Sequence, residues 1–262
     1  METTRTFAHL SDLHVGRDAA TDREAARVRD ALLAARVDDI LVTGDVTHRG
    51  RAGEMATFER LFAPLRDRLL VVPGNHDRLG DDVAARMIGP RVEVTRRPGL
   101  HVVRADSTAP HNRALLEGHG TLSPADVSAI DGAVGAAPRG ALVVLMLHHH
   151  LLPLPPEGVG ERLANLLGWP NAAELPRGRE LLGRLRGRCD VVAHGHRHTA
   201  SELSLGGTEA RPLRVMNAGC TTELGRVRLV VHAAGRILSE RWVEVSEAVR
   251  ALPAARALPA AA

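Results

Sequence analysis

The sequence predicts a layered α/β fold with buried, largely parallel strands, and two patterns support this prediction. From residue 6 to residue 193, short apolar segments of strand length alternate with longer segments whose apolar residues recur at helical spacing. After residue 200, strand-like segments follow one another and are separated by turns that contain glycine. Helices between successive strands are typical of parallel strands, whose two faces they cover.

The first half of the chain alternates between the two kinds of segment. The predicted strands are residues 6–11, 40–43 and 69–72, and the predicted helices are residues 21–36 and 53–65. The third strand stops at Pro73-Gly74, which is a turn signal. We expect Thr21 to be the N-cap of the first helix, because Glu24 follows three residues later as in a capping box.

The second half continues the pattern and then changes to strands alone. The predicted strands are residues 100–105, 141–147, 190–193, 200–205, 213–216, 226–231 and 237–243, and the predicted helices are residues 123–134 and 177–186. Residues 153–176 are rich in Pro, Gly and Leu, which fits either a lid over a site or a plain connection. We expect one domain over residues 1–247, followed by a disordered Ala/Pro-rich tail over residues 248–262.

The composition excludes several kinds of chemistry and several partners. The chain contains no lysine, so a Schiff-base lysine and a P-loop lysine are both excluded. Its net charge is +3, without a long basic run, and its aromatic content is 2%. Stacking platforms for single-stranded nucleic acid are therefore scarce, and nucleic acid is left as a partner that the sequence does not support.

The cysteines and the apolar segments indicate a cytoplasmic protein without a membrane anchor. Cys189 and Cys220 form no CxxC pair, and we expect both to be buried thiols. Residues 1–7 lack the basic start and apolar stretch of a secretory signal. The apolar run at residues 141–147 is far too short to span a bilayer.

Side chains that can bind metals follow five of the predicted strands, at the point where each strand ends. They are Asp12 and His14, Asp45, Asn75 and His76, His148, and His196 and His198. In open α/β sheets, ligands bind outside the carboxyl ends of the strands, so we expect these side chains to share one rim. Carboxylates, imidazoles and a carboxamide suit two divalent or trivalent first-row ions such as Mn, Fe, Zn or Co.

Two pairs of these residues have a spacing that bears on geometry. Asp12 and His14 are two positions apart, and so are His196 and His198. On a straight strand, residues two apart face the same side. Each pair is therefore expected either to clamp one metal ion or to divide between two neighbouring ions.

The ordered series of motifs resembles the calcineurin-like metallophosphoesterases, and it is most similar to the bacterial cyclic-nucleotide phosphodiesterase-like branch. The motifs are Ser11-Asp12-Leu13-His14, Gly44-Asp45, Gly74-Asn75-His76-Asp77, Leu147-His148 and Gly195-His196-Arg197-His198. The resemblance implies that residues 1–247 form a four-layer α/β/β/α sandwich with two mixed β-sheets.

The resemblance also implies a role for each matching residue. His76 would lie outside the metal shell and reach the scissile phosphate. The first metal ion would be bound by Asp12, His14 and His198, the second by Asn75, His148 and His196, and both by Asp45.

These roles imply a hydrolase that cleaves a phosphodiester, such as a 3′,5′-cyclic nucleotide. Two metal ions about 3.5–4 Å apart lower the pKa of a water, neutralise the phosphate and align the attack of the resulting hydroxide. His76 would assist the leaving group, a contribution of roughly 10²–10⁴-fold. The alternatives are a phosphomonoester or pyrophosphate as small-molecule substrate, or a non-catalytic binding scaffold. Oligomeric state is not predicted.

The sequence departs from the protein Ser/Thr phosphatase branch at one informative position. That branch has an Asp three residues beyond the bridging Asp, where it orients the catalytic His, and His48 stands at this position here. We therefore disfavour a protein phosphatase. The group that orients His76 is left open, and Asp77 is expected either to take that role or to serve structure.

The remaining histidines are expected to have structural or surface roles. His9 lies inside a predicted strand and is expected to be a hydrogen-bonded core residue, and His194 is expected to be structural. If the preceding strand persists, His149 would point to the side opposite His148. The residues without a partner pattern are expected on the surface or in loops, and they are His101, His111, His119 and His232.

Overall fold

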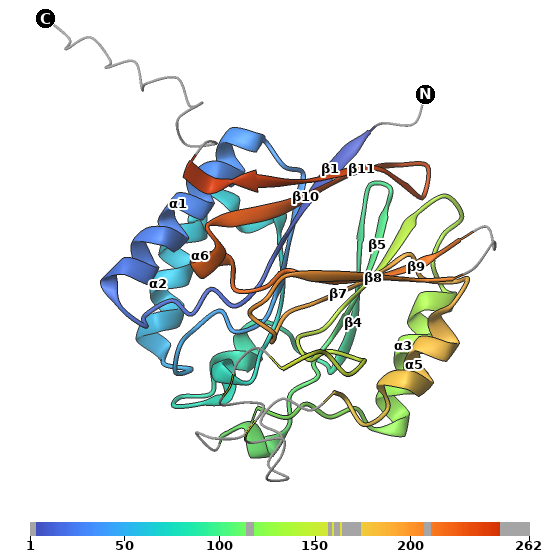
Figure 1. Ribbon diagram of the computed structural model, residues 1–262, viewed down its shortest axis with the longest axis horizontal. Helices are drawn as coiled ribbons and strands as arrows, with labels where there is room; N and C mark the ends of the chain where they lie inside the picture. The colour runs from blue at the N-terminus through green and yellow to red at the C-terminus, as the bar shows by residue number, and fades with distance from the viewer. Residues whose placement is uncertain are drawn as a thin grey trace, which may run out of the picture.

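Two mixed β-sheets lie face to face, and each carries helices on its outer side (Figure 1). The computed structural model describes residues 4–113, 118–156, 159, 163, 174–206 and 211–246. Because both sheets mix parallel and antiparallel strands and both have a helical layer, the predicted four-layer α/β/β/α sandwich is confirmed.

The first sheet has the strand order β11-β10-β1-β2-β3. Its strands are β1 (Arg5–Leu10), β2 (Asp39–Thr43), β3 (Leu69–Val72), β10 (Arg226–Ala233) and β11 (Arg236–Glu244). β1, β2 and β3 are parallel, whereas β10 is antiparallel to both β1 and β11. The C-terminal hairpin therefore extends a parallel sheet that was begun by the first residues of the chain.

The second sheet has the strand order β4-β5-β6-β7-β9-β8. Its strands are β4 (Val92–Arg97), β5 (Leu100–Ala105), β6 (Leu142–Met146), β7 (Val191–His194), β8 (Ser201–Leu205) and β9 (Leu213–Asn217). The four inner strands are parallel, and the edge strands β4 and β8 are antiparallel to their neighbours.

Helices cover the outer faces of the two sheets (Figure 1). α1 (Ala19–Ala35) and α2 (Ala52–Phe62) pack on the first sheet, and α3 (Pro124–Gly135) and α5 (Gly178–Leu185) pack on the second. A four-residue helix, α6 (Thr221–Leu224), joins β9 to β10. Among the helices of the described ranges, none is both long enough and apolar enough to cross a bilayer.

Three apolar layers hold the sandwich together. One lies between the first sheet and α1 and α2, and another between the second sheet and α3 and α5. The third lies between the sheets, where Phe7 and Leu41 of the first sheet meet Val144 and Val191 of the second, all four fully buried. Each such side chain contributes about 1.5–3 kcal/mol when it leaves water, so this inner layer fixes the sheets against each other.

The strands and helices predicted from the sequence are present, with bounds shifted by at most three residues. The predicted cap of the first helix is wrong. Asp18 caps α1, since its Oδ1 accepts hydrogen bonds from the backbone N–H groups of Ala20 (2.9 Å) and Thr21 (2.8 Å). Thr21 instead lies buried in the first turn. An Asp side chain caps a helix as effectively as Thr does. Because Asp18 is the cap, α1 begins before the first residue of the apolar pattern from which it was predicted.

Among the described residues, the strand β4, the helix α6 and four short 3-10 helices were not predicted. β4 carries the sequence Val-Glu-Val-Thr-Arg-Arg, whose partly exposed, polar pattern fits an edge strand paired on one side. α6 is too short to show helical periodicity. The tail at residues 248–262 and most of the segment 153–176 lie outside the described residues, so the boundary at residue 247 and the lid stay predictions.

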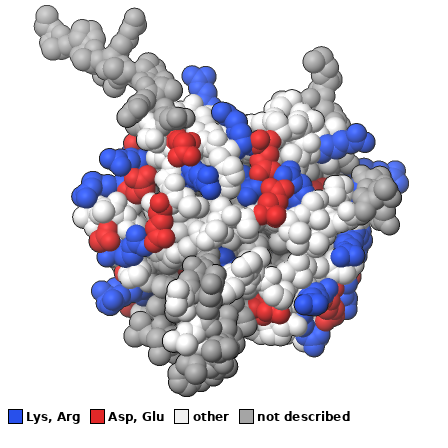
Figure 2. Space-filling model, in the orientation of Figure 1, with Lys and Arg blue, Asp and Glu red and all other residues white. Residues whose placement is uncertain are grey.

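Charged side chains of both signs are interspersed on the described part of the face in Figure 2. Among the described residues, exposed ion pairs include Arg86 with Glu59 (2.7 Å) and Arg177 with Glu180 (2.7 Å).

Candidate metal centre

Five loops meet at the carboxyl ends of the parallel strands. The loop after β1 bonds to the loop after β2, with Asp12 N–H donating to Gly44 O (3.0 Å) and His14 N–H donating to Asp45 O (2.9 Å). The loop after β7 joins them, because the His196 N–H donates to Asp12 Oδ2 (3.1 Å). Residues from distant parts of both sheets thus share one rim, as predicted.

Four side chains at this rim stand on left-handed backbone. The φ angles are 53° at Asp12, 47° at His14, 46° at Asp45 and 70° at His196. This region costs a non-glycine residue roughly 1–2 kcal/mol. Such strain persists where the surroundings over-determine the conformation, and it clusters at functional sites.

The left-handed residues correct one part of the sequence reasoning. β1 ends at Leu10 and β7 ends at His194, so neither pair of ligand candidates lies on a straight strand. Asp12 and His14 approach each other because the backbone curls after the strand, and His196 is turned in the same way. The expected proximity is correct, but its cause is loop geometry and not strand alternation.

Two glycines allow the loops to come this close. A Cβ on Gly44, where φ is 91°, would lie 2.7 Å from Cγ of His148 and 2.8 Å from the backbone N of Gly74. A Cβ on Gly195 would lie 2.6 Å from Oδ2 of Asp12 and would collide with Ser11. The glycines of the Gly-Asp and Gly-His motifs are therefore required by contacts between loops.

One half of the rim brings four potential ligand atoms together. His148 Nε2 lies 3.0 Å from Asn75 Oδ1, 3.3 Å from His196 Nδ1 and 3.4 Å from Asp45 Oδ2. His196 Nδ1 lies 3.1 Å from Asn75 Oδ1. Metal bonds of about 2.0–2.2 Å to nitrogen and oxygen place adjacent ligand atoms about 3.0–3.4 Å apart. These four residues therefore fit one metal ion.

The orientation of His148 is set by the backbone. Its Nδ1–H donates to the carbonyl oxygen of Thr43 (2.8 Å), which leaves Nε2 facing the other ligand candidates. The ring is fully buried. Burial alone would lower the pKa of His148, but the Asp45 carboxylate raises it to about 9. In the metal-free protein, His148 and Asp45 therefore form a buried ion pair.

The other half of the rim consists of Asp12, His14 and His198, whose potential ligand atoms lie within 4.8 Å of one another. Oδ1 of Asp12 and both ring nitrogens of His14 are buried without a hydrogen-bond partner in the described structure. A buried polar group left unsatisfied costs about 1–3 kcal/mol, and a metal ion would remove that cost. Burial lowers the pKa of His14 to about 3, which keeps its imidazole in the neutral form that binds metals.

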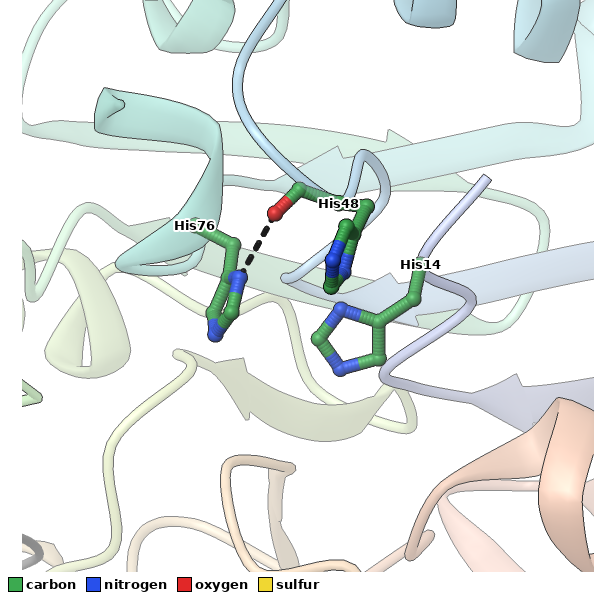
Figure 3. Close-up of side chains that lie close together, drawn as sticks. All are labelled: His14, His48 and His76. Atoms are coloured by element: carbon green, nitrogen blue, oxygen red, sulfur yellow. Dashed lines mark hydrogen bonds between the residues drawn. The ribbon is translucent and has the colours of Figure 1, made fainter. Parts of the chain in front are cut away.

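His76 lies beside this half of the rim, next to His14 and His48 (Figure 3). Its Nδ1–H donates to the backbone carbonyl of His48 (2.7 Å), and its Nε2 lies 4.0 Å from Asp45 Oδ2. Burial alone would lower the pKa of His76, but Asp45 and the His48 carbonyl raise it above its usual value. The His48 backbone thus orients His76, which answers a question that the sequence left open.

The rings around His76 form a compact group. His48 stacks on His76 with centroids 5.7 Å apart, and His14 meets His76 edge to face at 4.7 Å. The His76 side chain is 33% exposed, so part of the ring is open to solvent. Sequence reasoning noted His48 as a departure from a related branch but did not expect it beside the site.

Asp77 serves structure. It is fully buried and accepts four hydrogen bonds from two loops. The donors are the backbone N–H groups of Val46 (3.2 Å), Thr47 (2.8 Å) and Gly74 (2.9 Å) and the Thr47 hydroxyl (2.7 Å). Asp77 therefore joins the loop that carries Asp45 to the loop that carries Asn75 and His76.

The other two members of the histidine triplet also lie near the rim. Because β6 ends at Met146, His149 does not alternate as it would on a strand. It is buried, it bonds through Nδ1 to Ser107 Oγ (2.8 Å), and its ring lies 4.8 Å from that of His196. His150 stacks on His196 with centroids 5.7 Å apart. Both rings therefore pack around a proposed ligand.

The expectations for the isolated histidines are confirmed in part. His9 is buried and bonds to Thr43 Oγ1 (3.0 Å), and His194 is buried and bonds to the carbonyl of Gly195 (3.0 Å). The surface expectation is wrong for His101 on β5 and His232 on β10, which are both buried. His101 donates to the carbonyl of Ala133 (2.9 Å), a partner that only the fold supplies.

Asn217 supports the site although sequence reasoning gave it no firm role. Its Nδ2 donates to the carbonyls of Arg197 (2.8 Å) and Thr199 (2.9 Å), and its Oδ1 accepts from the Gly219 N–H (3.0 Å). These bonds hold the loop that carries His196 and His198. The available signal was its position at the end of a strand, which it shares with the ligand candidates.

Comparisons with known proteins agree with the fold and the motifs. The family model for calcineurin-like phosphoesterases matches residues 5–200. Two solved structures cover most of the chain at low identity. A purple acid phosphatase from yellow lupin seeds has a TM-score of 0.63 and 11% identity over 96% of this chain and 56% of its own. A dimetal phosphatase from Danio rerio has a TM-score of 0.63 and 12% identity over 92% and 99%.

Two curated relatives are each named a probable cyclic nucleotide phosphodiesterase. The protein from Vesicomyosocius okutanii subsp. Calyptogena okutanii is 28% identical over 69 residues, which cover 26% of this chain and 30% of the relative. The protein from Ruthia magnifica subsp. Calyptogena magnifica is 27% identical over 79 residues, which cover 28% and 34%. The matched parts thus span about a third of each relative's length.

The role of Asp77 leads to a stability prediction. Replacing Asp77 by Ala leaves buried N–H donors of two loops without an acceptor, so we expect the free energy of unfolding to fall by about 3 kcal/mol or more. Chemical denaturation monitored by circular dichroism measures this change. Asp67→Ala is the control, because Asp67 is exposed, and it should alter stability by about 0.5 kcal/mol or less. Equal effects of the two substitutions would show that Asp77 does not join the loops.

Proposed function

The chain belongs to the calcineurin-like phosphoesterase family, and we propose that it is a two-metal hydrolase that cleaves phosphodiesters. The observation that carries this proposal is the convergence of seven oxygen and nitrogen ligands at one rim. Several of their atoms are buried without a hydrogen-bond partner in the described structure. Such a set is unfavourable in an empty protein and favourable around metal ions.

We assign the seven ligands to two adjoining positions. Asp12, His14 and His198 would hold the first ion, and Asn75, His148 and His196 would hold the second. Asp45 would contact both. The ligand atoms of Asp12, Asp45 and His148 lie within 4.8 Å of one another, which supports a shared role for Asp45. The nitrogen and oxygen donors accept Mn, Fe, Zn or Co, between which geometry alone does not discriminate.

Bound metal ions and His76 would have separate roles in the proposed reaction. Bound metal ions would supply charge that neutralises the phosphate and would lower the pKa of a water. His76 faces the same space through Nε2, with its ring fixed by the His48 carbonyl. The raised pKa of His76 favours the protonated ring, which can donate a proton to the leaving oxygen.

The names of the two curated relatives support a phosphodiester, and within that class a 3′,5′-cyclic nucleotide, as the substrate. Such a substrate has a poor leaving group, because a ribose alkoxide leaves far less readily than a phenolate. Proton donation by His76 is therefore most valuable for this class. That difference gives a direct test of the role of His76.

We predict that the effect of His76→Ala depends on the leaving group. The kcat for a 3′,5′-cyclic nucleotide should fall by about 10²–10⁴-fold, because its alkoxide needs a proton. The kcat for bis(p-nitrophenyl) phosphate should fall much less, because p-nitrophenolate leaves without one. Steady-state kinetics in Mn²⁺ with both substrates measure the two changes.

His111→Ala is the matched control, since His111 is an exposed histidine outside the ligand set, and it should leave both rates unchanged. Equal losses for the two substrates in His76→Ala would contradict proton donation. If the unmodified protein hydrolyses neither diester in Mn²⁺, the hydrolase proposal fails. If the protein hydrolysed a phosphomonoester or a pyrophosphate faster than either diester, that compound class and not a phosphodiester would be the substrate.

A second prediction concerns the pH dependence of metal binding. With its pKa raised to about 9, His148 carries a proton at neutral pH that must leave before Nε2 binds a metal ion. The affinity for one Mn²⁺ should therefore rise about tenfold per pH unit between about pH 6 and pH 8, with release of about one proton. Calorimetric titration in buffers of different ionisation enthalpy measures both quantities. A flat profile without proton release would contradict the buried pair of His148 and Asp45.

A further inference from the structure

We propose that Glu223 is a positioning residue for His198 and that Arg17 holds Glu223 in place. The inference rests on the proposed function, in which His198 binds the first metal ion. Nothing in the sequence motifs includes Glu223 or Arg17, and both lie on elements next to the ligand loops.

His198 is the ligand candidate that most needs an orienting partner. Its side chain is 41% exposed, whereas His14 and His148 are buried and cannot rotate freely. His148 is further fixed by the Thr43 carbonyl. An exposed imidazole keeps several rotamers and two tautomers unless a hydrogen bond selects one.

Glu223 is placed to supply that hydrogen bond. Its Oε2 lies 3.3 Å from His198 Nδ1, and because a carboxylate only accepts, a hydrogen bond between them requires the hydrogen on Nδ1. Nε2 is then left with its lone pair and lies 3.9 Å from Asp12 Oδ1, on the side of the first metal position. Carboxylates that accept from the second nitrogen of a metal-bound histidine fix its tautomer and strengthen its binding.

Arg17 completes the chain of contacts. Its Nη1 donates to Glu223 Oε1 (2.6 Å), and its Nε donates to Thr21 Oγ1 (3.0 Å) at the start of α1. The two oxygens of Glu223 therefore have separate partners, one on each side. Arg17 follows His14 by three residues, so this contact also links the loop of His14 to the carboxylate that orients His198.

The backbone of α6 places Glu223 independently of this ion pair. The Cys220 N–H donates to the His198 carbonyl (3.0 Å), and the Thr221 N–H donates to the Ser11 carbonyl (3.0 Å). α6 is thereby fixed to both loops that supply the first metal position. Because exposed ion pairs contribute little to stability, we assign Glu223 to positioning and not to folding.

Cys220 offers an alternative use of the same residues, since His198, Cys220 and Glu223 also bring ligand atoms within 4.8 Å of one another. The Cys220 thiol is buried and donates to the Asp12 carbonyl (3.1 Å). Burial raises the pKa of the Cys220 thiol to about 12, and the protonated thiol is already used as a donor to the backbone of the Asp12 loop. The positioning role therefore accounts for Glu223 better than a separate thiolate site does.

The test is Mn²⁺ binding to Glu223→Ala and Glu223→Gln, measured by equilibrium dialysis with elemental analysis. We expect one of the two Mn²⁺ dissociation constants to rise about 10–100-fold in Glu223→Ala, with a smaller rise in Glu223→Gln, and the other constant to stay unchanged. Glu180→Ala is the control, because Glu180, on α5, is a similar carboxylate paired with Arg177 and Arg184. It should bind both ions normally.

Combination with His198→Ala assigns the affected ion. If Glu223 acts through His198, adding Glu223→Ala to His198→Ala should weaken binding no further. An additive loss, or equal weakening of both ions in Glu223→Ala, would overturn the positioning role and indicate general support of the loops. Unchanged binding of both ions in Glu223→Ala would also overturn it.

A second readout needs no metal and separates this inference from the proposed function. In the metal-free protein, ¹⁵N NMR of the His198 ring should show the Nδ1–H tautomer, and Glu223→Ala should shift the population toward Nε2–H. An unchanged tautomer would overturn the inference even if metal binding changed. If the unmodified protein bound no Mn²⁺, the proposed function would fail, whereas the tautomer shift would still report on Glu223.

Discussion

The close approach of five loops at the shared rim of two sheets is the constraint on which the rest of the structure depends. The apolar layer between the sheets keeps these strand ends together, so that the His196 N–H reaches Asp12 across 184 positions of sequence. The approach requires glycine at Gly44 and Gly195 and left-handed backbone at four polar residues. A sandwich with three buried apolar layers is stable enough to hold such strained loops.

Backbone carbonyls and carboxylates determine what each imidazole can do at this rim. Thr43 O accepts from His148, and His48 O accepts from His76, which leaves the Nε2 atom of each ring directed at the site. Both carbonyls belong to the segment around Asp45. The segment from Thr43 to His48 therefore contains the carboxylate that we propose to contact both ions, and its backbone orients two histidines on other loops.

Local patterns in the sequence predicted the layered α/β class and the residues at the rim, whereas the four-layer arrangement was predicted from the resemblance to a known family. Apolar runs mark buried strands, and polar residues at their carboxyl ends mark a shared rim. The features that the sequence did not predict depend on tertiary contacts. The orientation of His76 uses the carbonyl of His48, a group that every residue carries and that leaves no sequence signal. β4 was not predicted because it is a polar edge strand, and α6 was not predicted because it has only four residues.

Metal stoichiometry tests most directly whether Asp45 joins two metal positions at this rim, as we propose. We predict that the protein binds two Mn²⁺ ions per chain in native mass spectrometry, and that Asp45→Ala binds at most one while keeping the circular dichroism spectrum of the unmodified protein. Two ions retained by Asp45→Ala, or none bound by the unmodified protein at saturating Mn²⁺, would contradict the claim.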